Sequence, residues 1–165
     1  MELEAWTERM KLLVERFEST FEQINGYEAE GNLVEPMSTG APATPDGLPD
    51  DLIKLYQAVR EVRLPDLENG YFIHPIEFIL NARANGTPMH SSEISDGQIY
   101  VFGSNGGGDL FAVPFTGAPV YLLPPGRVHS NVYRSTAMFP QKISNDIESF
   151  LLLLESKLER AIEDH

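Results

Sequence analysis

The chain has 165 residues, of which 42% are hydrophobic, and its 25 Asp and Glu outnumber 12 Lys and Arg to give a net charge of −13. This length fits a single domain spanning residues 1–165 with a sizeable core, and the hydrophobic content excludes a disordered chain. The absence of cysteine excludes disulfides, thiolate metal sites and a cysteine nucleophile, and it suits a reducing cytoplasm.

The acidic charge excludes nucleic acid and anionic membranes as direct partners, because both would repel this chain. Basic proteins would be attracted to it, although an acidic surface can also serve solubility alone. No apolar run approaches the length of a bilayer, and Glu2 and Glu4 stand where a secretory leader would be basic and apolar. We therefore expect a cytoplasmic protein that is a monomer or a weak homodimer.

Residues 2–24 have the period of an amphipathic helix, because one stripe of the helix gathers the large apolar side chains. The stripe consists of Leu3, Trp6, Met10, Leu13, Phe17, Phe21 and Ile24. Asn25-Gly26 is a suitable helix end, since glycine tolerates a left-handed backbone. Residues 27–47 show no period and are rich in Gly and Pro, which predicts a long loop.

A second helix is predicted to open at Leu48-Pro49, with an apolar stripe reaching Val59 and no continuation beyond Pro65. Residues 71–73 predict a short strand after the Asn69-Gly70 turn, and residues 75–80 predict one or two helical turns. The polar stretch that follows, residues 81–97, predicts a loop.

Three strands are predicted at the centre, over residues 99–102, 110–115 and 119–123. The first two are joined by the glycine-rich turn of residues 103–109, which supplies backbone freedom for a reversal. A phosphate-binding loop would need a lysine, a hydroxyl residue and a helix after the last glycine, whereas Asp109 and a strand follow here. The turn is therefore interpreted as a structural hairpin.

Residues 131–138 predict an edge strand, and residues 144–162 predict a long amphipathic helix capped by Ser144 or Asn145. Taken together, the elements predict an α+β fold. A central antiparallel, or mixed, sheet of about four to six strands would pack against the N-terminal and C-terminal helices.

No residue pattern has the specificity of an enzyme or metal signature. The four histidines are His74, His90, His129 and His165. No histidine has a carboxylate at helical spacing within a strongly predicted helix; His74 and Glu77 have that spacing, but Pro75 lies between them and no third ligand is apparent, so we expect no metal, no cofactor and no catalytic residue. Ser104 follows Gly103, but it lacks the remaining pattern of a nucleophile elbow.

Several pieces of the chain, in their order, resemble the SUKH superfamily, the group of cell-wall-assembly regulators and bacterial toxin-immunity proteins. The resemblance consists of Leu48-Pro49, Asn69-Gly70, the hairpin of residues 103–113, Pro119-Val120-Tyr121, and the run of residues 143–151. In that last run Ile147 stands where the family commonly has Phe, and Ser149 replaces an acid. The loop of residues 27–47 and the stretch of residues 87–97 have no counterpart in it.

The resemblance implies a non-enzymatic immunity or antitoxin protein that neutralises a cognate toxin, often a nuclease. A basic, nuclease-like toxin domain also suits the charge, since a nuclease presents cations to phosphate. The acids near predicted loops are the candidate contacts: Asp66, Glu68, Glu93, Asp96 and Asp109. Each of them can also be an ordinary solvated charge.

Two other functions stay open at this point. The same fold could serve as a regulatory or scaffold module whose affinity comes from an exposed apolar patch rather than from charge. A small enzyme that uses the turn of residues 103–109 is the third possibility.

Overall fold

The computed structural model describes residues 1–38 and 46–164. Its helices are α1 (Leu3–Asn25), α2 (Asp50–Ala58), α3 (Ile76–Leu80), α4 (Ala82–Asn85) and α5 (Ile147–Glu163). Its strands are β1 (Leu33–Pro36), β2 (Val59–Leu64), β3 (Tyr71–Ile73), β4 (Ile99–Asn105), β5 (Leu110–Pro114), β6 (Val120–Leu123), β7 (Gly126–His129), β8 (Val132–Ser135) and β9 (Gln141–Ser144).

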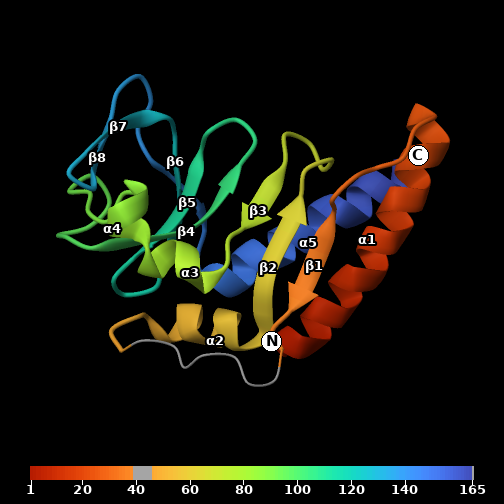
Figure 1. The fold of residues 1–165 in the computed structure, drawn as a ribbon, viewed down its shortest axis with the longest axis horizontal. Helices are drawn as coiled ribbons and strands as arrows, with labels where there is room; N and C mark the ends of the chain where they lie inside the picture. Colours follow the sequence, from red (N-terminus) through yellow and green to blue (C-terminus); the bar gives the residue numbers. More distant parts are fainter. Residues whose placement is uncertain (39–45, 165) are drawn as a thin grey trace.

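The fold is built on a seven-stranded sheet with the order β1-β2-β3-β4-β5-β6-β9, in which all neighbouring strands are antiparallel. β7 and β8 form a separate two-stranded ribbon. Figure 1 shows α1 and α5 beside and behind the sheet. The predicted α+β class, with an antiparallel sheet and helices from both ends of the chain, is confirmed. The sheet has more strands than the four to six expected.

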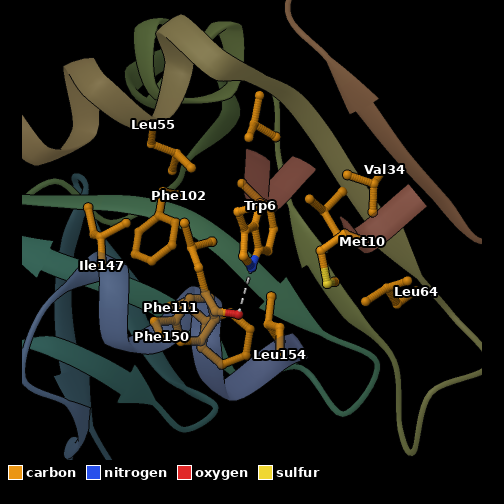
Figure 2. Packing of buried hydrophobic residues seen from close by; sticks show 14 of the residues in the cluster. Trp6, Met10, Val34, Leu55, Leu64, Phe102, Phe111, Ile147, Phe150 and Leu154 are labelled. Carbon is orange, nitrogen blue, oxygen red and sulfur yellow. Dashed lines mark hydrogen bonds between the residues drawn. The ribbon is translucent and has the colours of Figure 1, made fainter. Parts of the chain in front are cut away.

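One face of the sheet carries the main core. Val62 and Ile73 are directly opposed on β2 and β3, and both are buried on this face. Trp6 of α1 and Phe150 of α5 are also fully buried there, and Figure 2 shows them within the same cluster. The two helices are therefore stabilised because their apolar stripes cover a common face of the sheet.

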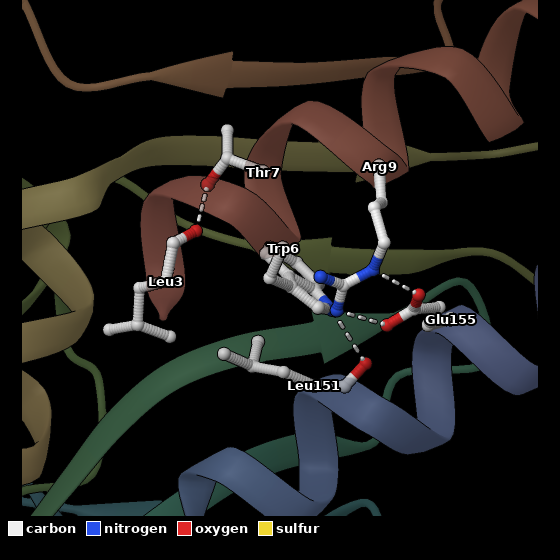
Figure 3. Close-up of polar contacts among 6 residues, drawn as sticks. All are labelled: Leu3, Trp6, Thr7, Arg9, Leu151 and Glu155. Carbon is white, nitrogen blue, oxygen red and sulfur yellow. Dashed lines mark hydrogen bonds and ion pairs between the residues drawn. The ribbon is translucent and has the colours of Figure 1, made fainter. Parts of the chain in front are cut away.

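Two polar contacts join α1 to α5, one inside this core and one at its surface (Figure 3). The buried indole N–H of Trp6 donates to the backbone carbonyl of Leu151 at 3.2 Å. The Arg9 guanidinium donates twice to the Glu155 carboxylate, at 2.8 and 3.2 Å, and this hydrogen bonding raises the pKa of Arg9. Each buried polar group in the contact thus has a partner, as burial requires.

The opposite face of the sheet is covered over β4 to β6 by a second apolar cluster. It contains Ile99, Val101, Ala112, Leu123 and Tyr133. Tyr133 comes from the β7–β8 ribbon, so the ribbon is anchored to the sheet by this side chain, and its hydroxyl donates to the carbonyl of Pro124.

The predicted loop of residues 27–47 is wrong in part, because it contains β1. Val34 lies opposite Val62, both side chains are buried, and this pairing makes residues 33–36 a strand despite their surroundings. Residues 39–45 of the predicted loop lie outside the described residues, as does His165. The predicted loop of residues 81–97 likewise contains the short helix α4.

Three further details differ from expectation. Three strands, β2, β7 and β9, were also not predicted, and β2 begins at Val59, which was expected to end the stripe of the second helix. β8 lies within residues 131–138 as expected, but it belongs to the ribbon, and the edge of the main sheet is β9. The cap of α5 is Asp146 rather than Ser144 or Asn145, because its carboxylate accepts the Ser149 N–H at 2.7 Å.

Candidate functional site

Two hairpin turns meet at one end of the sheet, on the side of the molecule where β3 begins and β4 ends. Tyr71 of β3 pairs with Asn105 of β4, and the β2–β3 and β4–β5 turns both extend beyond this pair. The turns are packed so closely that a Cβ on Gly106 would lie 1.9 Å from the carbonyl oxygen of Asn69. Only glycine fits at Gly106, so the sequence of the turn determines how closely the two hairpins approach.

This end of the sheet gathers three of the five candidate contact residues. Asp66 and Glu68 lie in the β2–β3 turn, and Asp109 lies in the β4–β5 turn. Glu28 and Glu30, between α1 and β1, are exposed in the segment that packs against Asp66. We call these five carboxylates (Glu28, Glu30, Asp66, Glu68 and Asp109) the acidic edge.

Asp66 holds the edge together. Its carboxylate accepts hydrogen bonds from the Glu30 backbone N–H at 3.1 Å and from the Asn32 amide at 2.7 Å. Its own N–H donates to the Asn32 side-chain oxygen at 3.3 Å. The segment after α1 is therefore fixed to the β2–β3 turn, and Asp66 has a structural role as well as a charge.

Glu68 joins the turn to α5. Its backbone has φ of 51°, and its carboxylate accepts from the Tyr71 hydroxyl at 2.6 Å and from the Lys157 ammonium at 3.1 Å. These contacts lower the pKa of Glu68, with the Tyr71 hydrogen bond as the largest cause. Glu68 therefore stays ionised well below neutral pH.

Asp109 closes its own turn. The Asn105 amide donates to the Asp109 carboxylate at 2.8 Å, while the Asn105 side-chain oxygen accepts the Asp109 N–H at 3.0 Å. The reversal that the glycine run predicted is thus a hairpin turn, stabilised by a reciprocal Asn–Asp contact.

A cleft of about 440 Å³ lies beside the acidic edge, where α1 and α5 end. Its apolar lining includes Phe21, Ile24 and Leu67, and its polar lining includes Asp66, Glu68, Lys157, Arg160 and Asp164. The C-terminal turns of both helices line it, so the negative ends of two helix dipoles add to the carboxylates. The cleft therefore combines apolar side chains with three carboxylates and two cations, of which Lys157 is paired with Glu68.

An aromatic side chain stands next to this cleft. Tyr27 is 63% exposed, and its ring packs edge-to-face on Phe21 at a centroid distance of 5.5 Å. A second hollow, lined by Tyr27, Glu28, Glu30 and Asp66, continues from it. Tyrosine is enriched at protein interfaces, so the exposed ring of Tyr27 is suited to contact a partner.

The other two candidate contacts lie on the segment between α4 and β4. Glu93 accepts from both the backbone N–H and the hydroxyl of Ser135, at 3.0 and 2.6 Å. Burial raises the pKa of Tyr133, and the charges of Glu93 and then Asp109 raise it further. Asp96 is exposed and has no hydrogen bond or ion pair within residues 1–38 and 46–164.

Sequence reasoning missed a contact between His74 and Ser104. Their Nε2 and Oγ atoms lie 2.8 Å apart, and the imidazole stacks on Phe78 with ring centroids 4.4 Å apart. Burial lowers the pKa of His74, which favours the neutral ring. The pairing of Phe72 with Ser104 across β3 and β4 brings them together, and this pairing could not be inferred from either segment alone.

This His–Ser pair has two members of a nucleophile–base arrangement. In the described ranges no carboxylate bonds the second ring nitrogen of His74, which is the contact that orients a catalytic imidazole. The same ranges contain no group of three or more potential metal ligands. Within them, no helix combines the length and apolar character that crossing a bilayer requires.

Comparison of the chain with protein-family models, with curated proteins and with solved structures gives no match.

Proposed function

We propose that this chain is a non-enzymatic immunity or antitoxin-type protein that binds and neutralises a basic, nuclease-like toxin domain. The observation that carries the proposal is the acidic edge, where five carboxylates gather and two of them, Asp66 and Glu68, line a cleft that also has apolar side chains. The resemblance to the SUKH superfamily agrees with this function. In the proposal the protein acts in the cytoplasm, uses no cofactor and does not contact nucleic acid itself.

Charge and shape both favour a basic protein partner at this edge. The net charge of −13 would speed the encounter with a cationic surface, and the carboxylates would then fix its orientation. The exposed ring of Tyr27 and the apolar lining of the cleft supply the area that charge alone does not. A toxin that cleaves nucleic acid must expose cations, and covering them removes its activity.

Co-expression with the product of the adjacent gene tests the proposal. We expect that product to be toxic alone and harmless in the presence of this protein. The charge-reversed variant Glu28→Lys/Glu30→Lys should restore toxicity, because both side chains are exposed on the acidic edge. A harmless gene product, or one that stays toxic beside the wild-type protein, would reject the proposed function.

A matched control separates the acidic edge from overall charge. Glu8→Lys/Glu15→Lys reverses two exposed acids of α1 that are not candidate contacts and also changes the net charge from −13 to −9. We expect this control to protect cells, and its association rate at physiological salt to exceed that of Glu28→Lys/Glu30→Lys. Equal effects of the two variants would show that the edge is not the interface.

A regulatory or scaffold module remains the second candidate because of one observation. Met138 and Phe139 are adjacent between β8 and β9, and they are 57% and 76% exposed. Neighbouring exposed apolar side chains are typical of docking sites. Binding through them should change little with salt, whereas binding through the acidic edge should weaken as salt rises.

A further inference from the structure

The β7–β8 ribbon has one face on the sheet and one face in solvent. Tyr133 is buried against the sheet, and Val128 is its direct partner across the ribbon. The next pair, Arg127 and Arg134, therefore projects from the solvent face, and both side chains are exposed. The ribbon is a rigid support for these two arginines, because Tyr133 anchors it.

The two outer edges of the ribbon differ. On β8, the Tyr133 N–H donates to the His90 carbonyl and the Ser135 N–H donates to the Glu93 carboxylate. Because the Tyr133 and Ser135 N–H groups point away from β7, Val128–Tyr133 and Gly126–Ser135 are pairs whose two residues exchange no backbone hydrogen bonds. The backbone groups of Gly126 and Val128 must then point outward from β7, where the described residues provide no backbone partner.

The charge of this region is opposite to that of the rest of the chain. Residues 110–145 contain Arg127, Arg134 and Lys142 and no Asp or Glu, in a chain with 25 acids. Neither ribbon arginine has an ion-pair partner in the described part of the chain. Glu93 is the acid bound to β8, and its carboxylate oxygens accept from Ser135.

Two like charges directly opposite each other destabilise an antiparallel pair. The pairing of Arg127 with Arg134 is therefore a local conflict, and such conflicts are concentrated at functional sites. An anion placed between or beside the two guanidinium groups would remove the repulsion. A carboxylate is well matched, because arginine binds it with two parallel hydrogen bonds.

We propose that the free edge of β7 binds an extended acidic segment of a partner protein as an added strand. The outward backbone groups of Gly126 and Val128 would pair with the segment, which is how exposed sheet edges capture peptides. A side chain opposite Arg127 would lie in one row with Arg127 and Arg134. Alternate side chains would contact Val128, which is 41% exposed.

The observations favour a protein segment over nucleic acid or a lipid surface. A duplex or an anionic bilayer carries dense negative charge and would be repelled by the net charge of −13, whereas a short segment carries only a few carboxylates. The free strand edge also offers backbone hydrogen bonds, which a peptide can use along its whole length. The site uses none of the five residues of the acidic edge, so the inference does not depend on the proposed function.

A defined peptide tests the inference. The probe is a fluorescently labelled, amidated hexapeptide of alternating Val and Glu, titrated into the full chain and followed by fluorescence anisotropy. We expect saturable binding, with Kd at least about tenfold higher for Arg127→Gln/Arg134→Gln, since two charge-assisted contacts are lost. The control Arg16→Gln/Arg83→Gln loses the same charge at two exposed sites and should bind like the wild type.

Two further readings make the result decisive. Amide shifts in a titration followed by NMR should be largest at Gly126 and Val128, and Val128→Pro should abolish binding while the far-UV spectrum is unchanged. The proposal is overturned if the wild type shows no saturable binding, if the control weakens it equally, or if the shifts lie elsewhere. It is also overturned if oligothymidine or phosphatidylserine vesicles bind the same arginines more tightly than the peptide does.

Discussion

The close approach of the two turns at the acidic edge gives a sharp steric prediction at Gly106. In Gly106→Ala the new Cβ would lie 1.9 Å from the backbone oxygen of Asn69, whereas real Cβ contacts do not fall below 3.0 Å. The two turns must therefore separate by about 1.1 Å, and the obstructing atom is backbone that cannot rotate away. Overpacking of this kind costs about 1 to 3 kcal/mol.

The neighbouring glycine supplies the control. In Gly107→Ala the Cβ would meet only the Asn105 side chain, at 3.5 Å, which is an ordinary contact. Surface changes of that kind stay within about 0.5 kcal/mol of the wild type. The two variants have the same composition and lie one residue apart in the same exposed turn, so their difference isolates the steric effect.

Urea denaturation and thermal denaturation, both followed by circular dichroism, measure the stability of the two variants. We expect Gly106→Ala to lower the free energy of unfolding by about 1 to 3 kcal/mol and the melting temperature by about 2 to 12 °C for a chain of this size. Its neutralising activity should also fall, since the turn that carries Asp109 moves away from Glu68. Equal stabilities of Gly106→Ala and Gly107→Ala would refute the reasoning about this contact.

Three other predictions concern single side chains. Asp146→Ala should destabilise the protein by about 1 kcal/mol in urea denaturation, because the Ser149 N–H loses its cap. The same hydrogen bond lowers the pKa of Asp146 in the folded protein. Its stabilising contribution is therefore full above the carboxyl's ordinary pKa of 3.8 and disappears as the pH falls through the lower pKa of the folded protein. Trp6→Phe should cost about 1 to 3 kcal/mol by circular dichroism, since it removes the hydrogen bond to Leu151 and leaves a cavity. Burial lowers the pKa of His74 below 6.5, so the unfolded chain binds that proton more tightly; the free energy of unfolding should decline as pH falls below 6.5, and His74→Gln should flatten this decline.

The long helices were predictable from the sequence because a single period describes them. The first stripe is buried from Trp6 to Phe17, whereas Ile24 at its end is 46% exposed, and the later stripe is buried from Ile147 to Leu158. In each helix, side chains three or four residues apart share one face regardless of what they pack against. The periodicity therefore carries the information before any tertiary contact is known.

The strand that follows α2 could not be predicted in the same way. Val59 begins β2 directly after Ala58, and no Gly or Pro separates the helix from the strand. Val59 and Val62 are three residues apart, which fits a helical stripe as well as a strand. Pairing with β1 and β3 decides between the two, and that pairing is a long-range property.

The candidate site was predictable by residue type but not by arrangement. The prediction that acids near loops are potential contacts included Asp66, Glu68 and Asp109, yet nothing in the spacing places the first two beside the third. Their proximity follows from the pairing of β3 with β4, whose partners are 30 or more residues apart. The cleft could not be foreseen either, since it forms where α1 and α5 end together.

The contact between Trp6 and Leu151 spans 145 residues, and it has a consequence for synthesis of the protein. Until residues 147–163 have left the ribosome, the growing polypeptide has nothing to cover the indole ring or the sheet face beneath α5. Chains dominated by such distant contacts fold slowly and expose apolar surface while they wait. We therefore expect the nascent polypeptide to need shielding by chaperones until residues 147–163 have been synthesised.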